Sequence, residues 1–301
     1  MPRRTTTSLC TAALVTVCLA GCGAGSAGAA TPAALAPDPS ATASAVARGV
    51  VLTAELDTDS GAVVLPFDRF ASTWNEQAVI AAAANTLVAV CAADHGVDVT
   101  VQAPQVDAVY GSELYYGPWT VEQAEQFGFA PPSPAQEQTA DDSPTTDVGG
   151  VDDQAVLARC GDLVEVNELT SALLDDGPWL EPLAVVTQGL VERPGARSAL
   201  SDLADCLEEE GLQVDADSPW LPEGADPGTT SDEQVALALQ LVGCKTTTGF
   251  TERMSSIEAS EQAPIVVTYV DELEARRAAV DEALESARAI LVEHPEVRSQ
   301  P

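Results

Sequence analysis

The sequence has little of several residue types on which common functional sites depend. Its 301 residues include two His, and 47 Asp+Glu far outnumber 13 Lys+Arg. Two imidazoles are too few for a His-built metal site. A formal net charge of −34 excludes a protein that follows nucleic-acid phosphates, because such a protein needs a basic face. We therefore expect no metal, no cofactor and no nucleic-acid partner.

Motifs of the common catalytic classes are also missing. The patterns GxSxG, SxxK, HExxH and the P-loop do not occur. Carboxylate pairs for glycoside cleavage carry no signal in a chain this acidic. We expect a non-enzymatic protein, and an envelope hydrolase that uses unrecognised carboxylates is the least favoured alternative.

A targeting signal is present at the N-terminus. Arg3 and Arg4 form a positive region, and the apolar run 9–20 is too short to span a membrane but suits a signal peptide. The run ends in Leu-Ala-Gly-Cys, which resembles a bacterial lipobox and implies cleavage after residue 21 and lipidation of Cys22. An ordinary secretory signal with a chance Cys is the alternative.

Residues 22–47 combine this Cys with a stretch of Gly, Ala, Ser, Thr and Pro that carries hardly any charge. Such a composition predicts a flexible tether, and two or three acyl chains anchor a protein stably. The sequence thus predicts an extracytoplasmic protein, lipid-anchored on the outer face of the cytoplasmic membrane.

Four cysteines remain after Cys22, namely Cys91, Cys160, Cys206 and Cys244. An even number in an exported chain predicts two disulfides, and no CxxC pattern suggests a redox or zinc site. Three pairings are possible on the count alone.

An internal repetition helps to choose the pairing. Cys91 and Cys206 each begin the pattern C-x4-G-apolar-x-Val at the end of a predicted helix, and each is followed by a Pro-Trp pair and a helix that ends in the next Cys. We interpret this as a weak duplication, which favours Cys91–Cys160 and Cys206–Cys244. Coincidence between two Ala-rich helices is the alternative.

The periodicity predicts a mainly α fold with a small β-hairpin element. The hairpin is expected from β-prone runs at 50–52 and 63–65 around a turn at 57–61. Capping boxes of Thr73 with Glu76 and of Thr120 with Gln123 begin helices. A short strand is expected at 97–101. The expected helices are 74–95, a short one that ends at Gly128, 153–175, 179–192, 195–210, 232–245 and 264–293.

Residues 130–152 are rich in Pro, Gly and acid without an apolar period, which predicts a disordered loop. The loop divides a first helical unit, 48–129, from a second unit, 153–298. The last helix of the second unit begins at Pro264, and its apolar stripe is interrupted by Arg277. This stripe favours packing on the preceding helix of the same chain over a coiled coil with a partner.

Aromatic residues gather in one segment, since residues 110–129 hold six of the thirteen in the chain. Tyr115, Tyr116, Trp119 and the later Trp220 are therefore candidate binding residues that could stack on cell-wall glycan or a partner. The alternative, which we favour, is that these rings fill gaps between helices.

Several of these features together resemble a family of uncharacterised actinobacterial lipoproteins. The similarity comprises Leu65–Phe70, the Cys91 and Gly96 pair, the segments Tyr116-Gly117 and Phe127–Phe129, and the later Cys206, Gly211 and Cys244-Lys245. The resemblance implies an exported, helical lipoprotein and supplies no activity.

We therefore expect a cell-envelope lipoprotein that binds or assists other envelope proteins. A small-ligand or glycan-binding module is the alternative function.

Overall fold

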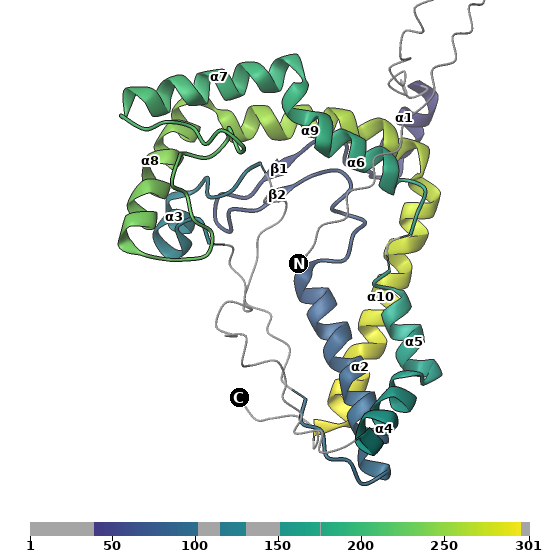
Figure 1. Cartoon of the computed structure of the whole chain (residues 1–301). Coiled ribbons are helices and arrows are strands. Elements are labelled where there is room, and N and C mark those ends of the chain that lie inside the picture. Colours follow the sequence, from purple (N-terminus) through teal and green to yellow (C-terminus); the bar gives the residue numbers. More distant parts are fainter. Residues whose placement is uncertain (1–38, 102–114, 131–150, 175, 296–301) are drawn as a thin grey trace, which may run out of the picture. The chain divides into compact units, whose positions relative to one another are not determined.

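The computed structural model describes residues 39–101, 115–130, 151–174 and 176–295. The predicted signal peptide, Cys22 and residues 131–150 of the predicted loop lie outside these residues. The last two residues of that loop, 151–152, are helical and not disordered. The described part is mainly helical with one two-stranded antiparallel hairpin (Figure 1), which confirms the expected fold class. The helices are α1 Pro39–Ala47, α2 Trp74–Asp94, α3 Val121–Phe127, α4 Val151–Gly161, α5 Val164–Ser171, α6 Leu180–Gly189, the 3-10 turn η2 Leu190–Glu192, α7 Pro194–Glu209, α8 Asp232–Thr248, α9 Phe250–Thr268 and α10 Val270–Glu293.

One region of the fold is built on α2, which packs against α10, α5 and α4. Its core is purely aliphatic and includes Ile80, Leu169, Val280, Leu284 and Leu291. Helix α2 is also the one helix among the described residues that is long and apolar enough to cross a membrane. Its position against three other helices accounts for that apolar composition.

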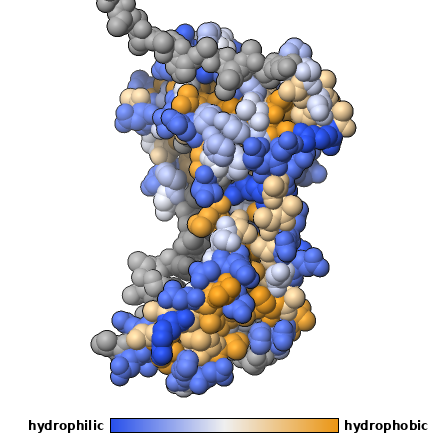
Figure 2. Space-filling view, turned by 90° about the vertical axis from the view of Figure 1, so that its right-hand side faces the viewer, coloured by the Kyte–Doolittle hydropathy of each residue, from blue (hydrophilic) through white to orange (hydrophobic). Residues whose placement is uncertain are grey.

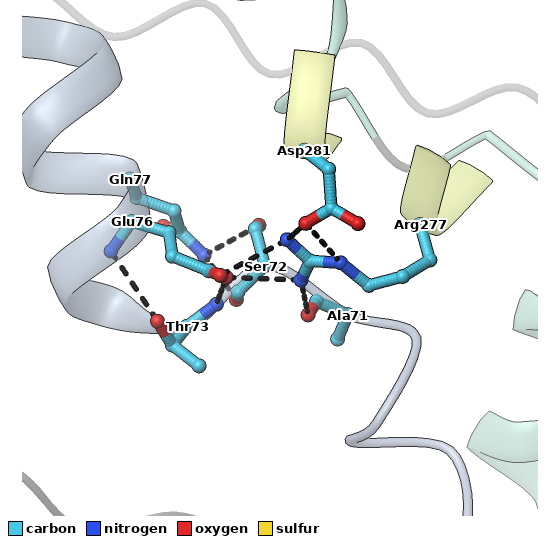
Figure 3. A network of polar contacts seen from close by, with 7 residues as sticks. All are labelled: Ala71, Ser72, Thr73, Glu76, Gln77, Arg277 and Asp281. Carbon is cyan, nitrogen blue, oxygen red and sulfur yellow. Dashed lines mark hydrogen bonds and ion pairs between the residues drawn. The ribbon is translucent and has the colours of Figure 1, made fainter. Parts of the chain in front are cut away.

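The N-terminus of α2 is fixed by the predicted capping box. The Thr73 hydroxyl accepts from the Glu76 backbone N–H, and the Glu76 carboxylate accepts from the Thr73 N–H. The same carboxylate receives two hydrogen bonds from Arg277 of α10, at 2.9 and 3.0 Å (Figure 3). Arg277 also donates to the Ala71 carbonyl and to Asp281. The polar break in the apolar stripe of α10 is therefore the residue that ties α10 to the start of α2.

The second region combines α3, α7, α8 and the first half of α9 with the hairpin. Strands β1 Glu55–Leu56 and β2 Val63–Val64 pair antiparallel, with Glu55 opposite Val64. The predicted cap of Thr120 and Gln123 begins α3. A smaller apolar cluster around Trp179, Leu183 and Val266 joins α6 to the second half of α9.

Both predicted disulfides are confirmed. Cys91 of α2 bonds to Cys160 of α4, and Cys206 of α7 bonds to Cys244 of α8. Each first cysteine precedes a glycine of positive φ, Gly96 at 79° and Gly211 at 80°, where the helix ends. Two disulfides indicate an extracytoplasmic protein, because such bonds persist in oxidising compartments.

The structure departs from the expected elements at the N-terminal side. The last part of the predicted tether is helix α1, whose Ala45 is buried and which packs against α9. The first hairpin strand is 55–56 and not 50–52. Residues 97–100 form no strand, because a strand needs a ladder partner and none lies beside them among the described residues.

Other departures concern the helices. The expected helix 153–175 is divided into α4 and α5 at residues 162–163, and α9 was not expected before Pro264. Pro264 lies inside α9, where burial of Ile265 and Val266 offsets the missing hydrogen bond. Helix α10 packs on α2 and not on α8, which corresponds to the predicted helix 232–245 that was expected to precede the C-terminal helix. Helices of the two predicted units are therefore interleaved.

Candidate functional site: a groove between an open strand edge and helix α9

Helix α9 buries a stripe of polar side chains. Thr251, Ser255, Glu258 and Gln262 are each at most 5% exposed and recur at helical spacing on one face. Hydrophobic periodicity does not detect such a stripe, which explains why the first half of α9 was missed. Polar residues that recur at intervals of four, three and four were the available signal.

Glu258 is the centre of this stripe. Its carboxylate accepts a 2.5 Å hydrogen bond from the Tyr116 hydroxyl and a longer one from the Gln262 amide. Gln262 in turn accepts from the Phe67 N–H at 3.2 Å. Burial raises the pKa of Glu258, and the nearby Asp68 carboxyl raises it further. These contacts fix both the chain after the hairpin and residue 116 against α9.

Lys245, the one lysine of the chain, is buried in the same region. Its ammonium donates to the Tyr116 and Pro118 carbonyls and lies 5.7 Å from the centre of the Phe250 ring. Burial lowers the pKa of Lys245 to about 7. Lys245 therefore holds the segment 116–118 from one side while Glu258 holds the Tyr116 ring from the other.

Asp68 lies in the turn that follows the hairpin. Its carboxylate accepts from the Leu65 N–H at 2.7 Å, which closes the turn that follows β2. Burial raises the pKa of Asp68, and the Leu65 N–H and the Arg69 guanidinium oppose that rise. The turn positions the hairpin over α9.

A groove of about 380 Å³ lies on the other side of the hairpin. One wall is the extended segment that contains β1, residues 52–54 and 56. The other wall is α9, with Glu252, Ser255, Ser256, Ala259 and Ser260. The volume falls at the lower end of the range for ligand pockets, roughly 300–1,000 Å³. This groove is our candidate functional site.

The register of the hairpin determines what β1 presents to the groove. Asp57 donates its N–H to the Ala62 carbonyl, and Glu55 is opposite Val64. Backbone groups in an antiparallel pair alternate between the two edges, so those of Ala54 and Leu56 point away from β2. The position opposite Thr53 is Pro66, which has no N–H and ends the ladder. An open strand edge therefore faces the groove.

Of the four aromatic candidates, Tyr115 and Tyr116 lie inside the second region, whereas Trp119 and Trp220 are half-buried at its edge. Tyr115 and Tyr116 are 5% and 1% exposed. The Tyr115 hydroxyl donates to the Thr187 carbonyl, and its ring lies edge-on to Trp220 with centroids 4.8 Å apart. The indole N–H of Trp119 donates to the Gly61 carbonyl at 2.7 Å. The Tyr115 and Tyr116 rings therefore fill the space between helices and offer no face on which a glycan could stack.

The two histidines of the chain do not line this groove. His95 is the exposed C-cap residue of α2, and His294 follows the end of α10. Within the described ranges, no three His, Cys, Asp or Glu side chains are placed to hold a metal ion.

The chain was compared with protein-family models, curated proteins and solved structures, and none of them matches it.

Proposed function

We propose that the chain is a lipid-anchored extracytoplasmic lipoprotein that acts, without catalysis, as a binding or accessory component for another envelope protein. The groove beside α9 carries this proposal, because it is a shaped recess with an unpaired strand edge on a disulfide-bonded body. The lipobox-like end of the signal peptide and the resemblance to actinobacterial lipoproteins support the anchor.

The buried aromatic rings favour this function over glycan binding. Stacking on a sugar needs an exposed ring face, and none of the described residues that line the groove is aromatic. The groove instead offers backbone groups, hydroxyls and one carboxylate, which suit a protein segment.

Photo-crosslinking in intact cells tests the binding role. A photoreactive residue at Ser256, in the groove, should crosslink one specific membrane or exported protein. The matched position is Ser286, an exposed serine of α10 that does not line the groove, and it should not give that product. Recovery of cell-wall glycan alone, or of the same products from both positions, would overturn the accessory role.

A separate variant tests the anchor. Cys22→Ser should move the protein from the membrane pellet to the soluble exported fraction, because it removes the acylated thiol. Unchanged membrane fractionation would contradict lipidation at this residue.

A further inference from the structure

Among the described residues, no second strand pairs with the edge of β1 that faces the groove. The chain bends at Thr53, and only Glu55 and Leu56 pair with β2, so the edge that can accept a further strand comprises residues 54–56. The N–H and C=O groups of Ala54 and Leu56 face the groove. Such an edge is a template on which another extended segment can add as a strand.

The α9 wall of the groove is rich in hydrogen-bond acceptors. The Ser255 hydroxyl donates to the Glu252 carbonyl, and the Ser260 hydroxyl donates to the Ile257 carbonyl. Both oxygens therefore retain lone pairs to accept bonds, and Glu252 adds a carboxylate. A matching occupant must supply donors toward α9, as the outer N–H groups of an added strand and a basic side chain would.

The two faces of the segment differ in character. Leu52, Ala54 and Leu56 are half-buried against the apolar clusters, whereas Thr53 and Glu55 are exposed. An added strand shares these faces, so its alternate side chains would be apolar toward the core and basic beside Glu252. The Glu55 carboxylate already pairs with the Arg69 guanidinium at 3.1 Å. The chain's net charge of −34 likewise favours a positively charged partner.

We propose that the groove binds an extended, basic segment of a partner protein, which adds as a strand to the edge of residues 54–56. This inference rests on the proposed binding function and specifies how the partner is recognised. The backbone supplies hydrogen bonds to Ala54 and Leu56, and the Glu252 carboxylate selects cationic side chains.

Two synthetic hexapeptides test the proposal on the exported full chain with Cys22→Ser. A Lys-Val-Lys-Val-Lys-Val peptide should shift the amide NMR signals of residues 52–56 and 252–260 at millimolar concentration. A Glu-Val-Glu-Val-Glu-Val peptide should bind about tenfold more weakly, since repulsion by the Glu252 carboxylate replaces an attraction.

A pair of proline variants tests strand addition itself. Ala54→Pro removes the N–H that faces the groove and should weaken binding of the Lys-Val peptide by roughly tenfold, the loss of about one hydrogen bond. Thr53→Pro removes an N–H on the opposite edge and should leave binding unchanged. Equal binding by both variants would overturn strand addition.

A charge variant tests the selection of a basic segment. Glu252→Gln should reduce the difference between the two peptides, whereas Glu233→Gln, on the exposed start of α8, should not. If no peptide shifts the groove signals while the Ser256 crosslink in cells persists, this inference fails and the proposed function stands. If the crosslink is also absent, both fail.

Discussion

Each disulfide joins two helices, but the interiors beside the two bonds have opposite chemistry. Near Cys91–Cys160, the core of α2, α5 and α10 is aliphatic, and its one buried polar side chain on α2, Thr86, bonds to a carbonyl of its own helix. Its charged side chains lie at the margin, where Arg277 meets Glu76 (Figure 3). Near Cys206–Cys244, Lys245 and Glu258 lie inside.

The difference shows two ways to fix an arrangement of helices. Aliphatic packing stabilises in proportion to the area buried but specifies direction weakly. Buried charged groups stabilise little, because desolvation opposes their attraction, yet they tolerate few alternative positions. Both groups bond to Tyr116, which is 129 positions from Lys245 and 142 positions from Glu258 in the sequence. They therefore fix the segment that precedes α3.

The largest expected effect compares the disulfides directly. Replacing both cysteines of Cys91–Cys160 by Ser should lower the free energy of unfolding by about 4 kcal/mol, and the same change at Cys206–Cys244 by nearly as much. Sequence separations of 69 and 38 change the chain-entropy contribution only slightly. Urea denaturation of the two variants measures this. A much larger loss at the second bond would show that the polar interior depends on it.

The next prediction concerns the buried lysine and pH. The pKa of Lys245 is lowered to about 7 in the folded chain, against 10.5 for an ordinary lysine. The unfolded chain therefore binds more protons between these values, and stability should rise with pH above 7, by at most about 1.4 kcal/mol per pH unit. Below pH 7 Lys245 is protonated in both the folded and the unfolded chain, so the full cost of burying its charge lowers the stability there.

Lys245→Met is the control for this slope. The variant should lose the rise between pH 7 and 9, because no other lysine is present in the sequence. The raised pKa values of Glu258 and Asp68 act in the opposite sense at lower pH, where stability falls as pH rises. Parallel stability curves for the two proteins above pH 7 would contradict the prediction.

The smallest expected effect compares charges at the margins of the two regions. Arg277→Met should cost about 1–3 kcal/mol, because it leaves Glu76 half-buried without its two bonds. Arg253→Met removes a more exposed pair with Asp202 and should cost roughly 0–1 kcal/mol. Thermal unfolding of both variants gives the comparison. Equal losses would mean that the contact in Figure 3 is no more than a surface ion pair.

The sequence predicted local features of both regions well and the polar interior of the second poorly. Capping boxes and helix-ending glycines act over a few residues, so α2, α3 and the ends at Gly96 and Gly211 could be found. The internal repetition correctly paired the cysteines. The groove could not be predicted, because it depends on the register of a short hairpin against a helix about 200 residues later.

The same reasoning explains the aromatic segment and the C-terminal helix. Composition shows that rings gather at 110–129 but not which way they face, and the structure turns Tyr115 and Tyr116 inward. Arg277 looked like an interruption in an apolar stripe. Its partner Glu76 lies 201 positions away, beyond the reach of any local pattern.

The outer surface also carries apolar side chains among its polar ones. Figure 2 shows polar side chains interspersed with apolar patches on the face that includes α5 and α10. Val164 and Leu174 contribute to the exposed apolar surface, at 66% and 68%.

The burial of Lys245 has a practical consequence for labelling chemistry. Reagents that acylate amines find one side-chain target in the sequence, and in the folded protein this amine is 2% exposed. Amine-directed crosslinkers and dyes will therefore leave the Lys245 side chain of the native protein unmodified, and their reaction is limited to a free α-amino group. The rate at which they do react with Lys245 becomes a direct chemical measure of how often the region around α8 opens.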